Sequence, residues 1–175
     1  TLSILHSFEG ANDGANPSAA LVPGAEGGFY GTASGGGGFD HGSVFRIMPN
    51  GEFTRLHAFT GGTDGSSPAG ALAPGADGNF YGLTPNGGAS AKGNCFRITP
   101  GGVLATLYSF TGGTDGSSPA GGLVLGADGN FYGAAATGGL GQRGTVFRLT
   151  PSGVLTTLHP FGDLILKDGV YPSAG

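Results

Sequence analysis

The chain has 175 residues, and its 40 glycines and 11 prolines would indicate a disordered low-complexity chain if they followed no period. Only 10% of the residues are charged, against about 25% in an average soluble domain, and the formal net charge is -4 without any run of Lys or Arg. This charge balance excludes nucleic acid and anionic membrane surfaces as partners, and no apolar run reaches the roughly 18 residues of a membrane span.

A repeat with a constant offset of 51 residues dominates the sequence, as the spacing of Phe8 and Phe59 illustrates. Self-similarity at such a period is the signature of a repeat architecture. The recurring columns include Phe8, Phe59 and Phe110; Pro17, Pro68 and Pro119; Tyr30, Tyr81 and Tyr132; Arg46, Arg97 and Arg148. We divide this single array, residues 1–175, into an extra strand (1–8), repeat 1 (9–59), repeat 2 (60–110), repeat 3 (111–161) and the start of a truncated fourth repeat (162–175).

Taken in chain order, the elements predicted after the strand over 1–8 are two hairpins in each repeat. In repeat 3 the first hairpin joins strands over 123–125 and 131–133 through an Ala-Asp-Gly-Asn turn. After a glycine-rich loop, strands over 144–150 and 154–161 form the second hairpin around a Pro-Ser-Gly turn. Helices are almost excluded because glycine or proline interrupts nearly every window of helical length.

The aromatic residues indicate where the repeats meet. Of the 17 Phe and Tyr side chains, 13 fall into four recurring columns: Phe8/59/110/161, Phe29/80/131, Tyr30/81/132 and Phe45/96/147. A four-stranded unit this small cannot bury its apolar face alone, so it must stack on its neighbours. The fold class predicted is therefore all-β, with three tandem four-stranded antiparallel units resembling propeller blades, and the columns, together with Leu21/72/123, form the core.

Three motifs carry a resemblance to a known family. The phrase G-x-D-G-N-F-Y-G is followed by V-F-R-I/L-T-P-x-G-x-L-x-x-L-x-x-F and then by G-G-T-D-G-S-S-P. This pattern resembles the GloVer tandem repeat of bacterial exported proteins with varied C-terminal anchors. The resemblance implies blade-like sheets and an extracellular or cell-surface location. It brings no established reaction and so supplies no catalytic residue.

The number of repeats predicts incomplete closure. A closed propeller needs roughly four to eight blades, and this chain offers three. An unpaired strand exposes a row of N–H and C=O groups and invites pairing with another chain. The sequence therefore indicates either a piece of a larger propeller or a protomer, open or closed only by oligomerisation, that joins itself head to tail by strand pairing, as in a filament.

Repeated charged residues suggest structural pairs. Arg46, Arg97 and Arg148 follow a Phe on the third strand of each unit, where a buried guanidinium needs a partner. The equally repeated carboxylates are Asp13, Asp64 and Asp115. We expect one structural Arg–Asp pair per unit. A further column of His6, His57 and His159 has Tyr in its remaining position, which indicates packing rather than catalysis.

The first loop is a weak candidate for calcium. Side-chain oxygens and carbonyls are the ligands that Ca²⁺ prefers, and this loop offers four such side chains: Glu9, Asn12, Asp13 and Asn16. Asp and Asn in such loops more often cap turns. We therefore expect no cofactor, with calcium as the alternative.

Hydroxyl clusters in the second and third repeats are possible O-glycosylation sites on an exported protein. They comprise Thr60, Thr63, Ser66, Ser67, Thr111, Thr114, Ser117 and Ser118. The glycine-rich loops over 35–42, 86–93 and 137–144 vary most between repeats and are the first candidates for contacts with a partner. Cys95 aligns with Val44 and Val146, so we expect an inert core position.

The function predicted is that of a non-enzymatic extracellular structural or self-assembling surface protein whose main partner is a second copy of itself. The alternative is a propeller-type binding module for a glycan or a protein. We predict no enzyme, because no carboxylate pair or histidine cluster with catalytic spacing stands outside the repeats.

Overall fold

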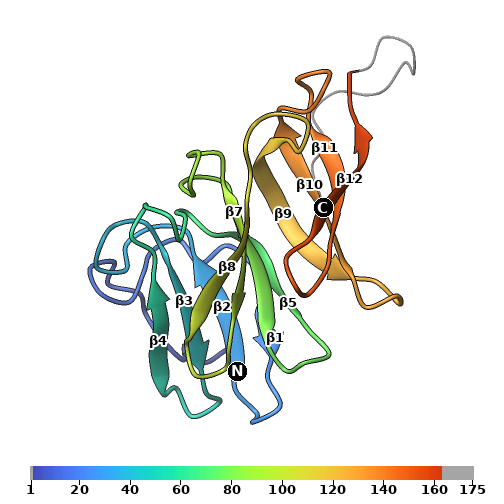
Figure 1. The fold of residues 1–175 in the computed structure, drawn as a ribbon. Helices are drawn as coiled ribbons and strands as arrows, with labels where there is room; N and C mark the ends of the chain where they lie inside the picture. Colours follow the sequence, from blue (N-terminus) through green and yellow to red (C-terminus); the bar gives the residue numbers. More distant parts are fainter. Residues whose placement is uncertain (1, 163–175) are drawn as a thin grey trace.

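The computed structural model describes residues 2–162, which form three four-stranded antiparallel sheets and no helix (Figure 1). Each sheet uses four consecutive strands in order, so the predicted fold class is confirmed. Blade 1 holds β1 (Val22–Pro23), β2 (Phe29–Ala33), β3 (Ser43–Ile47) and β4 (Phe53–Ala58). Blade 2 holds β5 (Ala69–Pro74), β6 (Phe80–Thr84), β7 (Asn94–Ile98) and β8 (Leu104–Ser109). Blade 3 holds β9 (Ser117–Leu125), β10 (Phe131–Thr137), β11 (Thr145–Leu149) and β12 (Leu155–Pro160).

Each blade has two chemically different faces, because side chains alternate along a strand. In blade 1, Phe29 pairs with Ile47 and Gly31 with Phe45, which places these residues on one face. Tyr30, paired with Arg46, lies on the opposite face with Val44. We call the first the Phe face and the second the Tyr face, and we use the same names for the equivalent residues of blades 2 and 3.

The blades stack with the Tyr face of one on the Phe face of the next. The ring of Tyr30 stacks on Phe80 at a centroid distance of 4.1 Å, and Tyr81 stacks on Phe131 at 4.0 Å. Phe59 and Phe110, which follow β4 and β8, are fully buried at the same two interfaces. The predicted aromatic columns thus form two inter-blade cores.

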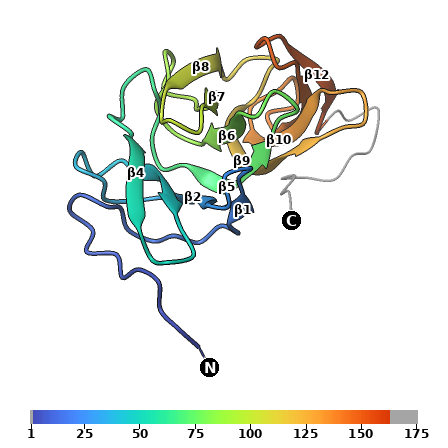
Figure 2. The same ribbon diagram turned by 90° about the horizontal axis from the view of Figure 1, so that it is seen from below.

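The inner strands β1, β5 and β9 lie toward one another, while β4, β8 and β12 form the outer rim (Figure 2). Gly70 and Gly121 allow the close approach of β5 and β9, since a Cβ on Gly70 would lie 2.0 Å from the carbonyl oxygen of Gly121. Both glycines have a positive φ, at 74° and 71°. Ala19 takes this position in blade 1 and does not adopt a positive φ. β1, which lacks this glycine, has two residues, whereas β5 has six and β9 has nine.

The predicted strand over 1–8 is not formed, because residues 2–8 belong to no sheet in the described chain. The prediction already left this segment without a sheet of its own, and what it missed is that residues 2–8 then adopt no strand structure. Its side chains still pack on blade 1, where His6 stacks on Phe53 at 4.0 Å and Phe8 contacts Phe45 at 5.1 Å. The predicted fourth repeat over 162–175 lies outside the described residues, apart from its first position.

Candidate functional site

The two end faces of the array expose apolar side chains that no blade covers within residues 2–162. On the Phe face of blade 1, Leu21 is 45% exposed, whereas its equivalents Leu72 and Leu123 are 3% and 6% exposed. On the Tyr face of blade 3, Val124 is 67% exposed, whereas its equivalent Ala73 in blade 2 is 4% exposed. The residues that are core inside the stack are therefore partly open at its two ends.

A groove of about 340 Å³ marks the open Phe face of blade 1. It lies between the N-terminal segment, residues 2–8, and the apolar side chains Leu21, Phe45 and Ile47. At the equivalent place in blade 2, Tyr30 and Val44 of the preceding blade fill the space in one core cluster. The groove therefore has the position and the lining of half an inter-blade interface.

The predicted Arg–Asp pairs are wrong, because each Asp is bonded to the histidine column instead. The carboxylate oxygen of Asp13 lies 3.0 Å from Nε2 of His6, and that of Asp64 lies 3.1 Å from Nε2 of His57. In the third copy the hydroxyl of Tyr108 donates to Asp115 at 2.9 Å. A residue at the end of one repeat is thus joined to the loop that opens the next, a contact that was not predicted from the sequence.

These carboxylates also close their own loops. Asp115 accepts hydrogen bonds from the backbone N–H of Thr111 at 2.7 Å and from its hydroxyl at 2.6 Å, and Asp64 is bonded by Thr60 in the same way. Burial alone would raise the pKa of Asp64 and of Asp115, but these hydrogen bonds outweigh it and hold each pKa below its ordinary value. The ionised carboxylates of Asp64 and Asp115 are therefore the forms that hold the folded loops together.

The arginines lie on the Tyr faces, away from the Asp loops. Arg46 pairs across the sheet with Tyr30 and Thr54, and its guanidinium reaches the hydroxyl of Thr54 at 3.5 Å. Its charge also helps to lower the pKa of Glu26, after the larger effects of hydrogen bonds from Tyr30 and the backbone. The sequence analysis missed this acid–tyrosine contact at the hairpin tips, although an acid recurs four residues before the Tyr in every repeat: Glu26 and Tyr30, Asp77 and Tyr81, Asp128 and Tyr132.

The calcium candidate loop is closed by Asp13. Its carboxylate accepts from the backbone N–H of Glu9 and of Gly10, both at 3.0 Å, besides contacting His6. The carbonyl of Asn12 accepts from Arg55, and Asn16 adopts a positive φ of 57°. No group of three or more His, Cys, Asp and Glu gathers within the described ranges. Calcium binding by Glu9, Asn12, Asp13 and Asn16 stays a prediction.

The hydroxyl candidates differ in exposure. Ser66 and Ser117 are buried, and Ser117 lies 2.8 Å from the hydroxyl of Thr137, so neither presents a free hydroxyl. The exposed members are Thr60, Thr63, Thr111 and Thr114, while Ser67 and Ser118 are half-buried. The hydroxyls of Thr60 and Thr111 hydrogen bond to the loop carboxylates. Glycosylation therefore stays a prediction, best supported at Thr63 and Thr114.

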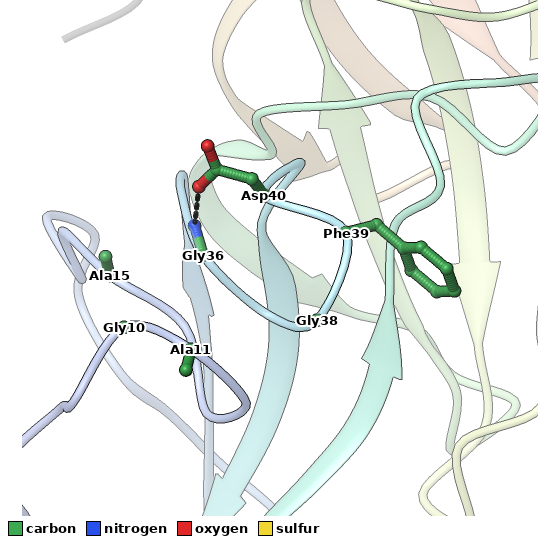
Figure 3. Close-up of a pocket in the computed structure, with 7 residues that line it drawn as sticks. All are labelled: Gly10, Ala11, Ala15, Gly36, Gly38, Phe39 and Asp40. Carbon is green, nitrogen blue, oxygen red and sulfur yellow. Dashed lines mark hydrogen bonds between the residues drawn. The ribbon is translucent and has the colours of Figure 1, made fainter.

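A second hollow, of about 520 Å³, lies between two loops of blade 1 (Figure 3). One loop contributes Gly10, Ala11 and Ala15, and the other is the variable loop over 35–42. Asp40 accepts a hydrogen bond from the backbone N–H of Gly36 at 3.2 Å, while the ring of Phe39 points away from the first loop. Phe39 is 60% exposed. This arrangement places an exposed ring and a carboxylate on a loop that the sheet of blade 1 holds at both ends, as in many binding loops.

Cys95 lies in the core between blades 2 and 3, as its column predicted, and burial raises the pKa of its thiol. A buried neutral thiol is a poor nucleophile. No helix in the described part of the chain has the length and apolar character to cross a membrane.

The stacked sheets and their repeats define a protein built from propeller-blade-like tandem repeats. The chain belongs to the Gloeobacter/Verrucomicrobia repeat family, whose pattern it matches over residues 1–175. The resemblance inferred from the motifs is thereby confirmed. No curated protein matches the chain.

Solved structures with similar folds are distant in sequence. A Thermus thermophilus protein described as an oxidoreductase (glucose dehydrogenase) matches with a TM-score of 0.54 at 17% identity, over 94% of this chain and 51% of that one. The GH43B protein of the Bacteroides ovatus xyloglucan PUL matches with a TM-score of 0.47 at 22% identity, over 86% and 31%. A protein described as a gluconolactonase gives 0.48 at 18% identity, over 78% and 45%. The chain thus spans about half or less of these proteins, and the first likeness supports the fold alone.

Proposed function

We propose that the protein is a non-enzymatic, self-assembling module of the cell surface. In the assembly, the Tyr face of blade 3 of one copy packs on the Phe face of blade 1 of the next. The observation that carries this proposal is the difference in exposure between the end faces and the internal interfaces, which share the same residue columns. The internal stacks show how two such faces fit, with a Tyr ring on a Phe ring at about 4 Å.

The energetics favour weak, concentration-dependent association. Burying each apolar or aromatic side chain contributes roughly 1.5–3 kcal/mol, whereas association costs about 4–15 kcal/mol before any contact is made. The end faces offer few such side chains, chiefly Leu21, Phe29, Val124, Tyr132 and Leu158. Their sum is comparable with the cost, so we expect assembly at high local concentration, as on a cell surface.

The acidic residues support a structural role over catalysis. Asp13, Asp64 and Asp115 are engaged in loop hydrogen bonds, and the tip acids are bonded to tyrosines. A hydrolytic site would need two carboxylates, or a nucleophile and a base, facing the same space. The extracellular location rests on the family resemblance.

Sedimentation velocity over a range of concentrations, followed by electron microscopy, tests this proposal. Val124→Lys places a charge on the Tyr face of blade 3, and we expect it to abolish association. Val103→Lys is the matched control, because Val103 is 69% exposed but lies in the turn before β8, away from the end faces. Filaments or closed rings of the unmodified chain would support head-to-tail packing. A monomer at every concentration, or equal loss with both lysine variants, would overturn it.

The second candidate function is ligand binding at the loop hollow of blade 1. The observation that favours it is the hollow of about 520 Å³ lined by Phe39 and Asp40, a size within the roughly 300–1,000 Å³ of small-molecule sites. Titration with a panel of neutral and acidic oligosaccharides, read by NMR, tests it. Binding that is lost in Phe39→Ala and Asp40→Asn would support this function, and unchanged spectra with every sugar would exclude it for that panel.

A further inference from the structure

The N-terminal segment, residues 2–8, holds the same position on blade 1 that the outer strand of a preceding blade holds on the next. A Cβ on Gly51 would lie 3.2 Å from the carbonyl oxygen of Leu5. The equivalent contact joins Gly102 to the carbonyl of Leu56 in β4, and it repeats once more at Gly153. The segment therefore follows the path of β4 over blade 2, although it has no sheet of its own.

The side chains repeat this equivalence. The rings of Phe8 and Phe45 lie 5.1 Å apart with an interplanar angle of 66°, and those of Phe59 and Phe96 lie 5.3 Å apart at 66°. His6 contacts Asp13 as His57 contacts Asp64. Two different segments thus make one set of contacts with the Phe face and opening loop of the blade that follows.

We infer that residues 2–8 occupy the docking site for β12 of a second copy, and that they must leave blade 1 before that copy can pack on it. This inference rests on the head-to-tail assembly proposed above. Residues 155–161 repeat the pattern L-x-x-L-H-x-F of residues 2–8, at an offset of 153 residues, which is three repeats of 51. The incoming strand can therefore replace the contacts that the N-terminal segment gives up.

Replacement of residues 2–8 by β12 is favoured because β12 brings the rest of its blade with it. In the part of the chain that the structure describes, residues 2–8 pack on blade 1 outside any sheet, and Leu2 and Ile4 remain 93% and 79% exposed. β12 arrives as part of a four-stranded blade whose Tyr132 can stack on Phe29 and fill the groove beside the segment. The exchange therefore keeps the Phe–Phe contact and adds a Tyr–Phe contact. Because residues 2–8 compete with β12 for the same site, they lower the apparent affinity of one copy for another.

Two Phe→Ala substitutions distinguish the effect of the competing segment, residues 2–8, from that of the incoming residues 155–161. Phe8→Ala weakens only the N-terminal segment, so we expect the dissociation constant for self-association to fall about tenfold. Phe161→Ala weakens only the incoming strand, and we expect the dissociation constant to rise at least tenfold. Sedimentation equilibrium gives both constants, and circular-dichroism melts confirm that each variant is folded. A synthetic peptide of residues 1–8, added to Phe8→Ala, should restore the weaker association of the unmodified chain.

The outcomes separate this inference from the function on which it rests. If the unmodified chain associates and Phe8→Ala leaves the constant unchanged or raises it, the competition is overturned while head-to-tail assembly stands. An unchanged constant for Phe161→Ala would remove β12 from the interface and overturn the inference as well. If all three folded proteins stay monomeric, the proposed self-assembly itself fails.

Discussion

Phe29 and Phe80 hold the same position in the repeat, but their surroundings differ. Phe80 is 4% exposed because Tyr30 of the preceding blade stacks on it. Phe29 lies on the end face, where no tyrosine covers it within the described residues, and it stays half-buried. The contribution of a repeated residue to stability therefore depends on whether another blade packs on it. Inner and end positions of one column should therefore respond differently to the same substitution.

The largest effect is expected from truncating this column. Phe80→Ala should lower the free energy of unfolding by about 3–5 kcal/mol, because it empties a closed inter-blade core. Phe29→Ala should cost less than half as much in the monomer, since its ring is already partly in water. Urea denaturation at a concentration where the chain is monomeric measures both. Equal losses would show that the end face is as well covered as the interior.

Gly70 and Ala19 give the next comparison, at the inner strands. Gly70→Ala should cost about 1–3 kcal/mol for the positive φ alone, and the clash with the backbone of Gly121 adds to this. Ala19→Gly gives blade 1 the residue of the other two repeats, and we expect it to lengthen β1 with little change in overall stability. Slower hydrogen exchange at residues 19–22 in that variant would support this explanation, and unchanged exchange would contradict it.

Much of the fold could be predicted from the sequence because the period and the turn residues are local signals. The offset of 51 residues and the two turns of each repeat were enough to predict four strands per unit and the aromatic columns. The structure of residues 2–8 could not be predicted from the period and the turns. These residues match β4 closely, and the count of strands already left them without a sheet, but a repeat pattern does not show that such an unpaired segment loses the strand conformation itself.

The contacts of the charged residues were harder to predict. Equal numbers of Arg and Asp suggested pairs, yet the Asp residues lie in loops beside the previous repeat, while the arginines lie on the sheet opposite tyrosines. The clue was the separation of seven residues between His57 and Asp64, which recurs between Tyr108 and Asp115. The equal numbers predicted Arg–Asp ion pairs, whereas in the folded loops each Asp hydrogen bonds to a His or Tyr side chain and to the loop itself.

The Asp loops predict a dependence of stability on pH. Because the pKa of Asp115 is lowered in the folded protein, the unfolded chain binds its proton more readily. The stabilisation is therefore present above the unfolded pKa, near 3.8, and is lost as the pH falls through the lower folded pKa. Asp115→Asn should cost about 1–3 kcal/mol at neutral pH. Thermal melts should show a flatter acid limb for this variant than for the unmodified chain, and parallel limbs would argue against the assignment.

The smallest effect is expected at the hairpin tips, where Tyr81 and Tyr132 make the same hydrogen bond in different surroundings. Each hydroxyl donates to an acid four residues earlier, at 2.9 Å to Asp77 and 2.8 Å to Asp128. Burial, with help from the hydrogen bond to Asp77, raises the pKa of Tyr81 to about 12, and its ring is buried under blade 3. Tyr81→Phe should cost about 1 kcal/mol, because a part-buried hydrogen bond is lost while the exposed Asp77 carboxylate can bond to water instead. Tyr132→Phe should leave the monomer's unfolding unchanged, since water replaces the bond at the open face.

In the assembled form the two positions become equivalent, so a loss of stability at Tyr132 that emerges only with rising protein concentration would identify this face as the interface. A concentration-independent loss would instead show that the tip is fixed within the single chain.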